Sequence, residues 1–244
     1  MTSPATNHQP PTTALNISVL EVAYGAVTAV AGVSLTAAAG EVTCIMGRNG
    51  VGKTTLLRAI MGQHKTRAGV VELSGREITR LPAHDRARAG IALVPQGREI
   101  FPRLTVRENL EVAFSARGRR EAGAIDEVMG MFPILKQFAK RMGGDLSGGQ
   151  QQQLAIARAL VGKPSVLLLD EPTEGIQPNI IDEIGAVLRR LAAERGLAVV
   201  LVEQYVAFVR ETGHRFYAMD RGRIVASGTT AELTDEVVAR HLNV

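Results

Sequence analysis

The feature that most constrains this chain is a glycine-rich segment between an apolar stretch and a stretch of helical spacing. It reads Gly47-Arg-Asn-Gly-Val-Gly-Lys-Thr54, which matches the pattern G-x-x-x-x-G-K-[ST], and it follows the apolar residues 41–46. Glycines let the backbone turn so that its N–H groups point into one cavity, and the positive end of the following helix favours the same anion. We therefore predict a nucleotide phosphate loop in which Lys53 reaches the β- and γ-phosphates and Thr54 supplies a hydroxyl ligand to Mg²⁺.

Short apolar segments typical of strands alternate with segments of helical spacing along the chain. Strands are predicted at 17–24, 27–35, 41–46, 70–73, 91–94, 166–169, 198–202, 216–219 and 223–226, and helices at 53–61, 151–161, 180–195 and 235–242, with a turn at 37–40. This alternation predicts an α/β fold with a mostly parallel sheet. A helical pattern from 106 to about 138, broken at Pro133, predicts a helical subdomain inserted at about 99–150 in one domain spanning 15–244.

Composition argues against several classes of function. The net charge of +4 comes from basic residues spread among acids, without the Lys/Arg blocks and interleaved aromatics of nucleic-acid-binding surfaces, so no nucleic-acid partner is expected. Attraction to an anionic membrane face remains open. The single cysteine, Cys44, excludes an internal disulfide and a Cys-based zinc site, and its apolar neighbours predict a buried structural thiol. The five histidines show no metal-ligand spacing.

The chain shows no segment that would take it across or into a membrane. No stretch reaches the roughly 18–20 apolar residues that span a bilayer, and the first residues lack the layout of a signal peptide. Residues 1–14 are rich in Thr, Pro and polar residues and are predicted to form a disordered tail. We therefore expect a cytoplasmic protein.

Two acids, Asp170 and Glu171, end the most apolar predicted strand, Val166-Leu-Leu-Leu-Asp-Glu171. A carboxylate where a buried parallel strand emerges needs a partner, because burying it alone is costly. Beside a phosphate loop, Asp170 is suited to hold Mg²⁺ through water, and Glu171 to polarise the water that attacks the γ-phosphate. Without that loop upstream, the same pair would be compatible with a solvated acidic turn.

A second glycine-rich segment, Leu146-Ser-Gly-Gly-Gln150, lies directly before a predicted helix. It places Ser147 and backbone N–H groups at a helix N-terminus, which favours an anion, although on its own it would indicate an ordinary serine-capped turn. One nucleotide does not need two such loops in one chain. We infer that this loop contacts a nucleotide held by a second protomer.

These three segments, in this order, resemble the ATP-binding cassette (ABC) family, whose signature motif is similar to Leu146–Gln150. The resemblance covers about residues 17–227. It implies a P-loop NTPase core with a mostly parallel sheet, an N-terminal antiparallel β part and an inserted helical subdomain, with ATP and Mg²⁺ as ligands. The ATP-binding residues that it implies are Tyr24, Gly47, Arg48, Asn49, Gly50, Val51, Gly52, Lys53, Thr54 and Thr55 of one protomer and Ser147, Gly148, Gly149 and Gln150 of the other.

Further roles follow only from the resemblance. Tyr24 matches the aromatic residue that stacks on adenine, with plain packing of a strand tyrosine as the alternative. Gln96 matches the loop glutamine that contacts Mg²⁺ or the attacking water and senses the membrane partner, and residues 97–110 resemble the surface that receives the permease. The implied catalytic residues are Glu171, Lys53, Gln96 and Gln204, and the implied metal ligands are Thr54, Gln96 and Asp170.

Two positions depart from the usual family pattern. Gln177 stands where the family has an aspartate in a loop that crosses the dimer interface, and Gln204 stands where it has a switch histidine. Glutamine can hydrogen-bond a γ-phosphate but carries no positive charge at pH 7, so we expect lower intrinsic hydrolysis. Both departures resemble one ATPase branch of the branched-chain amino acid importer group, and residues 97–102, 174–178 and 203–205 are most similar to the urea importer's ATPase.

The sequence thus predicts the ATPase motor subunit of an importer, for urea or, as the alternative, for branched-chain amino acids. The expected partners are membrane permease subunits, a second ATPase subunit (a copy or a paralogue) in a head-to-tail dimer and, indirectly, a periplasmic or extracellular solute-binding protein. The chain would then lie on the inner face of the cell membrane.

Two competing readings are weaker. A soluble ABC protein of DNA repair or translation would carry a long coiled-coil insertion or a second cassette, and too few residues separate Gln96 from Leu146 for such a coiled coil. A non-hydrolysing regulatory subunit is the third reading, and the presence of Lys53, Asp170 and Glu171 counts against it.

Overall fold

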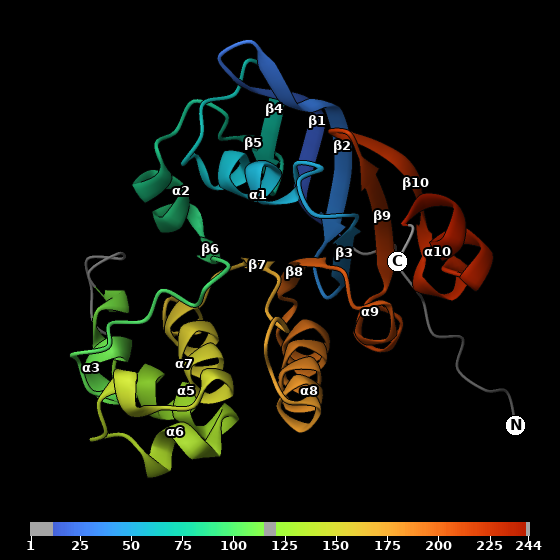
Figure 1. Ribbon diagram of the computed structural model, residues 1–244. Coiled ribbons are helices and arrows are strands. Elements are labelled where there is room, and N and C mark those ends of the chain that lie inside the picture. Colours follow the sequence, from blue (N-terminus) through green and yellow to red (C-terminus); the bar gives the residue numbers. More distant parts are fainter. Residues whose placement is uncertain (1–11, 115–120, 243–244) are drawn as a thin grey trace, which may run out of the picture.

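The computed structural model describes residues 12–114 and 121–242, which form two sheets with helices packed around them (Figure 1). The strands are β1 (Thr13–Tyr24), β2 (Val27–Ala38), β3 (Val42–Met46), β4 (Ala68–Leu73), β5 (Arg76–Glu77), β6 (Ile91–Val94), β7 (Val166–Asp170), β8 (Ala198–Glu203), β9 (Arg215–Asp220) and β10 (Arg223–Thr229). The helices are α1 (Lys53–Met61), α2 (Ala83–Ala89), α3 (Val106–Glu111), α5 (Ala124–Met131), α6 (Pro133–Gln137), α7 (Gly148–Val161), α8 (Pro178–Arg195), α9 (Val206–Thr212) and α10 (Asp235–His241). Among these described helices, none combines the length and the apolar character that a bilayer crossing requires.

The larger sheet has the strand order β10-β9-β3-β8-β7-β6. The five strands from β9 to β6 run parallel to one another, and β10 is antiparallel to β9 at the edge. The smaller sheet, of order β2-β1-β4-β5, is antiparallel throughout. The expected α/β fold, with a mostly parallel sheet and an N-terminal antiparallel part, is therefore confirmed.

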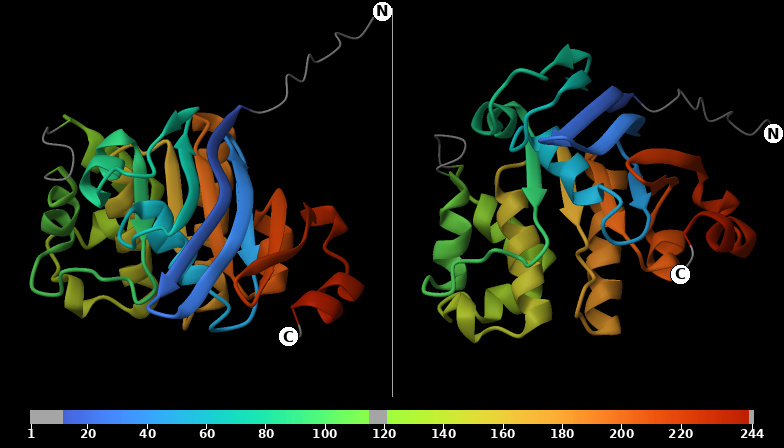
Figure 2. Two further views of the ribbon diagram at one scale, coloured as in Figure 1. Left: turned by 90° about the horizontal axis from the view of Figure 1, so that it is seen from above. Right: turned by 45° about the horizontal axis from the view of Figure 1, so that its top comes forward.

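The central strands separate two apolar cores, because successive side chains of a strand point to opposite faces of its sheet. In β7, Leu167 and Leu169 join the core beneath α7, α8 and α9, whereas Val166 and Leu168 join the core that α1 shares with the antiparallel sheet. Both faces of the large sheet are thus covered, which explains why its strands are apolar without alternation. Figure 2 shows the antiparallel sheet and the long helices on opposite sides of the central strands. The thiol of Cys44 is buried in this interior, as predicted, and burial raises its pKa.

Helices α3, α5, α6 and α7 gather in a separate lobe at the lower left of Figure 1. Their buried residues, including Leu110, Val128, Phe132 and Leu154, belong to the same core as the underside of the large sheet. The lobe ends with α7, which runs to Val161 and so extends past the boundary expected near residue 150. Because α7 also supplies buried residues beneath the parallel strands, it joins the lobe to the sheet.

Several expected boundaries were wrong. The turn predicted at 37–40 is shorter, since Ala37 is fully buried and β2 runs to Ala38, which pairs with Thr13 of β1. The same pairing places residues 13 and 14 of the predicted tail in a strand, while residues 1–11 lie outside the described residues. Helices α2 and α9 were not predicted, because α2 has only alanines as apolar residues and α9 groups its apolar residues at its start, so that neither shows a helical period.

A buried arginine ties α2 to the end of α1. The guanidinium of Arg86 donates hydrogen bonds to four carbonyl oxygens: Leu81 O at 2.9 Å, Ala59 O at 2.9 Å, Ile60 O at 2.7 Å and Thr79 O at 2.5 Å. Two of these acceptors are carbonyls near the C-terminus of α1, where a positive charge also interacts favourably with the helix dipole. Arg86 therefore ties the segment between β5 and α2 to the C-terminal end of α1.

Replacing Arg86 with alanine should lower the free energy of unfolding by about 3 kcal/mol, because it leaves a void and several buried carbonyls without donors. Arg88→Ala, on the exposed side of the same helix where Arg88 pairs with Asp85, is the matched control and should change stability by less than about 0.5 kcal/mol. Urea denaturation followed by circular dichroism measures both. Equal midpoints for the two variants would contradict the assigned role.

Candidate nucleotide-binding site

The loop between β3 and α1 is held in a shape that only glycine can adopt at two positions. Gly47 and Gly52 have φ angles of 151° and 108°. A Cβ atom added at Gly47 would lie 2.3 Å from the carbonyl oxygen of Met219, and one at Gly52 would lie 2.3 Å from that of Ala29. The predicted phosphate loop therefore has the tight backbone that turns several N–H groups toward one anion. It opens at the carboxyl end of a central parallel strand, where ligands bind in open α/β sheets.

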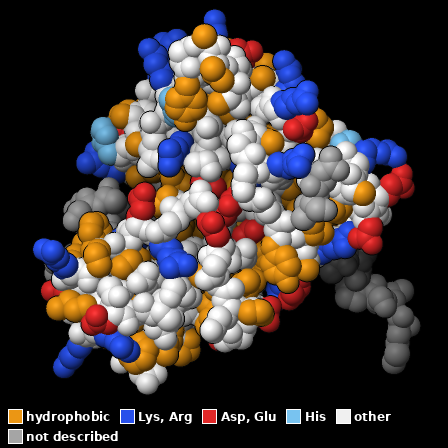
Figure 3. Space-filling view, in the orientation of Figure 1, with side chains coloured by type: hydrophobic (Ala, Val, Ile, Leu, Met, Phe, Trp, Pro, Cys, Tyr) orange, Lys and Arg blue, Asp and Glu red, His pale blue; other side chains and the backbone are white. Residues whose placement is uncertain are grey.

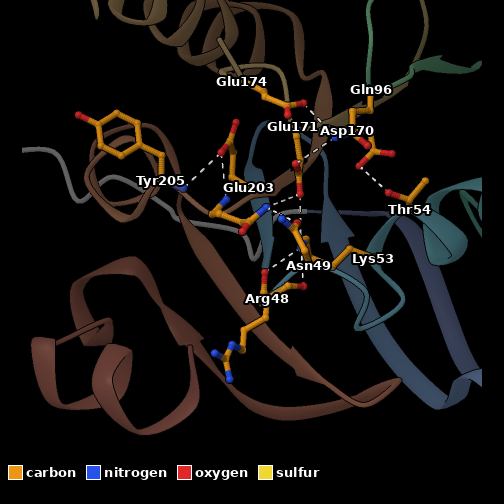
Figure 4. Close-up of polar contacts among 12 residues, drawn as sticks. Arg48, Asn49, Lys53, Thr54, Gln96, Asp170, Glu171, Glu174, Glu203 and Tyr205 are labelled. Atoms are coloured by element: carbon orange, nitrogen blue, oxygen red, sulfur yellow. Dashed lines mark hydrogen bonds and ion pairs between the residues drawn. The ribbon is translucent and has the colours of Figure 1, made fainter. Parts of the chain in front are cut away.

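Lys53, the first residue of α1, is nearly buried and points back into this loop. Its ammonium group donates to the carbonyl oxygens of Gly47 at 2.7 Å and Arg48 at 3.0 Å, and lies 3.4 Å from a carboxylate oxygen of Glu171 (Figure 4). The side chain of Arg48 points away from this cluster in Figure 4, so that Arg48 contributes its backbone. A cation is thus fixed where the phosphates of a nucleotide would lie, and is balanced by one of the two predicted acids.

Thr54 and Asp170 lie together, as a magnesium site beside a phosphate loop requires. The Thr54 hydroxyl donates to a carboxylate oxygen of Asp170 at 3.2 Å. Burial raises the pKa of Asp170, and the hydrogen bond from Thr54 opposes this shift. Two hard oxygen donors side by side fit Mg²⁺, and the described residues hold no group of three or more His, Cys, Asp or Glu side chains that could bind a metal on their own. Phosphate and water oxygens would have to complete the coordination.

Glu171 is the centre of the polar cluster. Its φ of 48° is a left-handed conformation that is strained for a non-glycine residue, and its N–H donates to Val202 O at 3.0 Å. One carboxylate oxygen accepts from Gln204 at 2.7 Å, and the other is 3.4 Å from the amide nitrogen of Gln96. Three segments predicted to carry chemistry therefore meet at one carboxylate.

Gln204 and Gln96 contact different neighbours besides Glu171. Gln204 also donates to the side-chain oxygen of Asn49 in the phosphate loop at 2.7 Å, and Gln96 donates to Glu174 at 2.9 Å. Gln204 is thus placed between the phosphate loop and the predicted base. The structure joins Gln96 to the two acids after β7, Glu171 and Glu174. Among the described residues, no hydrogen bond joins Gln96 to the predicted magnesium ligands Thr54 and Asp170.

Two acids in this cluster were not predicted from the sequence. Glu203 is buried at the end of β8, and its carboxylate accepts from the N–H and hydroxyl of Thr173 and from the N–H groups of Gln204 and Tyr205. Burial raises the pKa of Glu203, and these hydrogen bonds oppose the shift. Glu203 thereby fixes the segment that carries Gln204. Glu203 ends an apolar strand, which is the same sequence signal that identified Asp170, so this signal could have revealed Glu203. Glu174 is exposed in a loop and carries no such signal.

Tyr24 lies alongside α1, half exposed. Its ring meets the His64 ring edge-on at 4.2 Å between centroids, and its hydroxyl is 3.4 Å from that of Thr55. The side chain therefore borders the phosphate-loop helix, as an adenine platform would, although its ring already packs against a histidine.

The signature-like segment lies apart from the phosphate loop of the same chain. Ser147 caps α7, with its hydroxyl oxygen accepting from Gln150 N and its N–H donating to the Gln150 side chain. In the described part of the chain, no hydrogen bond or ion pair connects residues 147–150 with residues 47–55. Figure 3 shows acidic side chains near the centre of this face, over the region where β7 and β8 end, between the two halves of the molecule.

Comparison with known proteins assigns the family. The profile of the family described as ABC transporter matches residues 30–174, which include the phosphate loop, the signature segment and both acids. The chain therefore belongs to the ABC transporter family and is an ATPase whose hydrolysis of ATP is coupled to transport.

Two similar proteins take part in branched-chain amino acid transport. The high-affinity transport ATP-binding protein BraG of Pseudomonas aeruginosa is 40% identical over 86% of this chain and 90% of its own length. The probable transport ATP-binding protein LivF of Archaeoglobus fulgidus is 41% identical over 80% of this chain and 83% of its own length. Among solved structures, the dimeric post-hydrolysis state of the cassette MJ0796 bound to ADP and Pi has a TM-score of 0.81 and 28% identity, covering 88% of this chain and 98% of that one.

The site predicts that Gln204→His raises ATP turnover. A protonated imidazole beside the phosphate loop would add a charged donor, and the difference between charged and neutral donors, about 1.4 kcal/mol, corresponds to roughly tenfold in rate. Since histidine is protonated below a pKa of about 6.5, the gain should be larger at pH 6 than at pH 8. Gln204→Asn, a shorter neutral amide, is the control and should show no such pH dependence. A steady-state phosphate-release assay that finds no gain at either pH would contradict the weakened-site interpretation.

Proposed function

We propose that this chain is the ATPase subunit of an importer for branched-chain amino acids. The observation that carries the solute class is its 40% identity to BraG over most of both chains. Urea, which the segments 97–102, 174–178 and 203–205 favoured, is the second candidate solute. The solute would pass through the membrane subunits and not through this site. The site therefore supports the ATPase mechanism, and the uptake experiment below tests the identity of the solute.

Two cassettes would close head to tail around two ATP molecules. Each ATP would lie between residues 47–55 of one protomer and residues 147–150 of its partner, either a copy of this chain or a paralogue. The separation of these two loops within one chain supports this arrangement, as does the dimeric state of the similar cassette MJ0796. Phosphate contacts would hold the closed state, and hydrolysis would reopen it.

Catalysis would depend on positioning and electrostatics. Lys53, held by two carbonyls of its own loop, is placed to bind the β- and γ-phosphates, and Glu171 is placed to polarise the attacking water. Mg²⁺, held by Thr54 and Asp170, would neutralise phosphate charge. Gln204 and Gln96 would orient the Glu171 carboxylate, because each donates to a different one of its oxygens.

The permease would bind at the segment after β6, which comprises a loop and most of α3. This segment, residues 97–110, follows Gln96 directly, and Gln96 contacts both Glu171 and Glu174. A movement of the permease against this segment could therefore alter the catalytic cluster through one side chain. The chain would then lie on the cytoplasmic face of the membrane, with a solute-binding protein on the other side.

Glu171→Gln should abolish turnover while leaving ATP binding intact, so that the variant forms a stable ATP-bound dimer. The amide cannot accept a proton from the attacking water, yet it keeps the size of the side chain. Light scattering with size-exclusion chromatography, with Mg-ATP and with Mg-ADP, measures the dimer, either of this chain alone or mixed with a paralogue. Lys53→Ala is the control and should fail to bind ATP. Hydrolysis at the wild-type rate in Glu171→Gln would overturn the mechanism.

Deletion of the gene should abolish uptake of labelled leucine at low micromolar concentration and leave urea uptake unchanged. Complementation with the wild-type gene should restore it, and complementation with the Glu171→Gln variant should not. Loss of urea uptake alone would replace the proposed solute with urea and keep the ATPase mechanism. Unchanged uptake of both solutes would overturn the importer assignment.

A further inference from the structure

Arg98 follows Gln96 by two residues, in a loop whose backbone is held by hydrogen bonds on both sides. Gly97, Arg98 and Glu99 have successive φ angles of 83°, 71° and 45°, a left-handed run that non-glycine residues rarely adopt. Arg158 of α7 donates to the carbonyl oxygen of Glu99 at 2.8 Å, and Gln96 donates to Glu174 on the other side. The loop is therefore anchored on both sides of Arg98.

The guanidinium of Arg98 packs against the start of the signature helix. A Cβ atom added at Gly148, the first residue of α7, would lie 2.9 Å and 3.1 Å from its two terminal nitrogens. One added at Gly175, in the loop after β7, would lie 3.8 Å from one of them. Glycine at 148 thus leaves the space that the guanidinium occupies. Arg98 joins the signature segment to the loop that carries Glu174.

This cation has no counter-charge within the described residues. No ion pair or hydrogen bond of its guanidinium occurs there, and the first turn of α7 contains no acidic residue. The N-terminus of a helix carries about half a positive elementary charge, so that Arg98 adds to a charge of the same sign. The repulsion between the guanidinium and the helix N-terminus is unfavourable. It becomes an attraction of both groups for an anion when one lies between them.

The groups around Arg98 are donors that suit a phosphate. The Ser147 oxygen already accepts from Gln150 N, so its proton remains available, and the N–H groups of Gly148 and Gly149 have no partner within the helix. Ser147, Gly148 and Gly149 line a hollow of about 360 Å³, and the guanidinium of Arg98 lies beside Gly148 at its edge. Its one acidic lining residue, Glu183, accepts a hydrogen bond from Gln153 at 2.8 Å.

We propose that Arg98 binds the γ-phosphate of the ATP held by the partner protomer, together with Ser147 and the N-terminal N–H groups of α7. This inference rests on the proposed head-to-tail dimer, which brings such a phosphate to the signature segment. Arg98 is two residues from Gln96, so one loop would contact the chain's own Glu171 and the partner's nucleotide. Arg98 therefore acts on dimer closure and leaves the chain's own phosphate loop untouched.

The first test measures dimerisation in the Glu171→Gln background. Adding Arg98→Ala should weaken the ATP-dependent dimer by about ten- to hundredfold in sedimentation equilibrium, the range expected for losing hydrogen bonds to a charged group. Arg98→Lys, which keeps the charge, should recover part of this loss. Binding of labelled ADP to the monomer should stay within about twofold in all variants. Arg76→Ala, which removes an exposed arginine on β5, is the matched control and should dimerise normally.

The outcomes separate this inference from the proposed function. If Glu171→Gln itself forms no ATP-dependent dimer, alone or with a paralogue, both proposals fail. If it forms the dimer and Arg98→Ala forms it equally well, only the role of Arg98 is overturned. If Arg98→Ala weakens ADP binding to the monomer to the same degree, Arg98 acts on its own nucleotide, and the inference is likewise overturned.

Mixed dimers test on which protomer Arg98 acts. A Lys53→Ala chain paired with an Arg98→Ala chain keeps one intact composite site and should hydrolyse ATP as fast as Lys53→Ala paired with wild type. When both substitutions are in the same chain, the wild-type partner's ATP faces the altered signature segment, and turnover should fall about tenfold or more. The opposite order of rates would place Arg98 at its own nucleotide and overturn the proposal.

Discussion

The register of three neighbouring parallel strands determines where the polar groups of the site lie. Met46 at the end of β3 pairs with Glu203 in β8, and Asp170 at the end of β7 pairs with Val202 of β8. Because these strands run in the same direction, the residues that follow them meet at one edge of the sheet. A slip of one residue in either pairing would turn the strand's side chains to the opposite face and separate the acids from the phosphate loop.

The buried charges at this edge depend on one another. Lys53, Asp170 and Glu203 are all nearly inaccessible, and an isolated charge at such a position would be strongly destabilising. Lys53 is balanced by Glu171, Asp170 accepts from Thr54, and Glu203 accepts from backbone and hydroxyl donors. Burial nevertheless raises the pKa of both Asp170 and Glu203. The site thus maintains acids in an environment that disfavours their charge, which is typical of catalytic centres.

Long-range hydrogen bonds explain what sequence reasoning missed in the site. Glu203 positions Thr173 across 30 residues of chain, and Gln204 reaches Asn49 across 155. No local sequence pattern predicts these long-range hydrogen bonds, because they depend on which strands become neighbours in the sheet. Helix α1, in contrast, was predicted with its observed bounds, because the loop sets its start and Gly62, with a φ of 77°, ends it. Helices α2 and α9 lack the spaced apolar positions that reveal a helical period.

The sequence by itself determined the fold class through the alternation of apolar and helical segments, and the phosphate loop through a short run of fixed spacing. The pair of acids and the signature segment gained their interpretation from that loop and from a family resemblance. It also identified Gln204 and Gln96 as residues of interest through a resemblance. Only the tertiary structure decided that both glutamines meet at Glu171, that Glu203 supports Gln204, and that Arg98 lies against α7. The physical reason is that these contacts join the ends of different strands and the start of a distant helix, and the packing of the two cores brings those ends together.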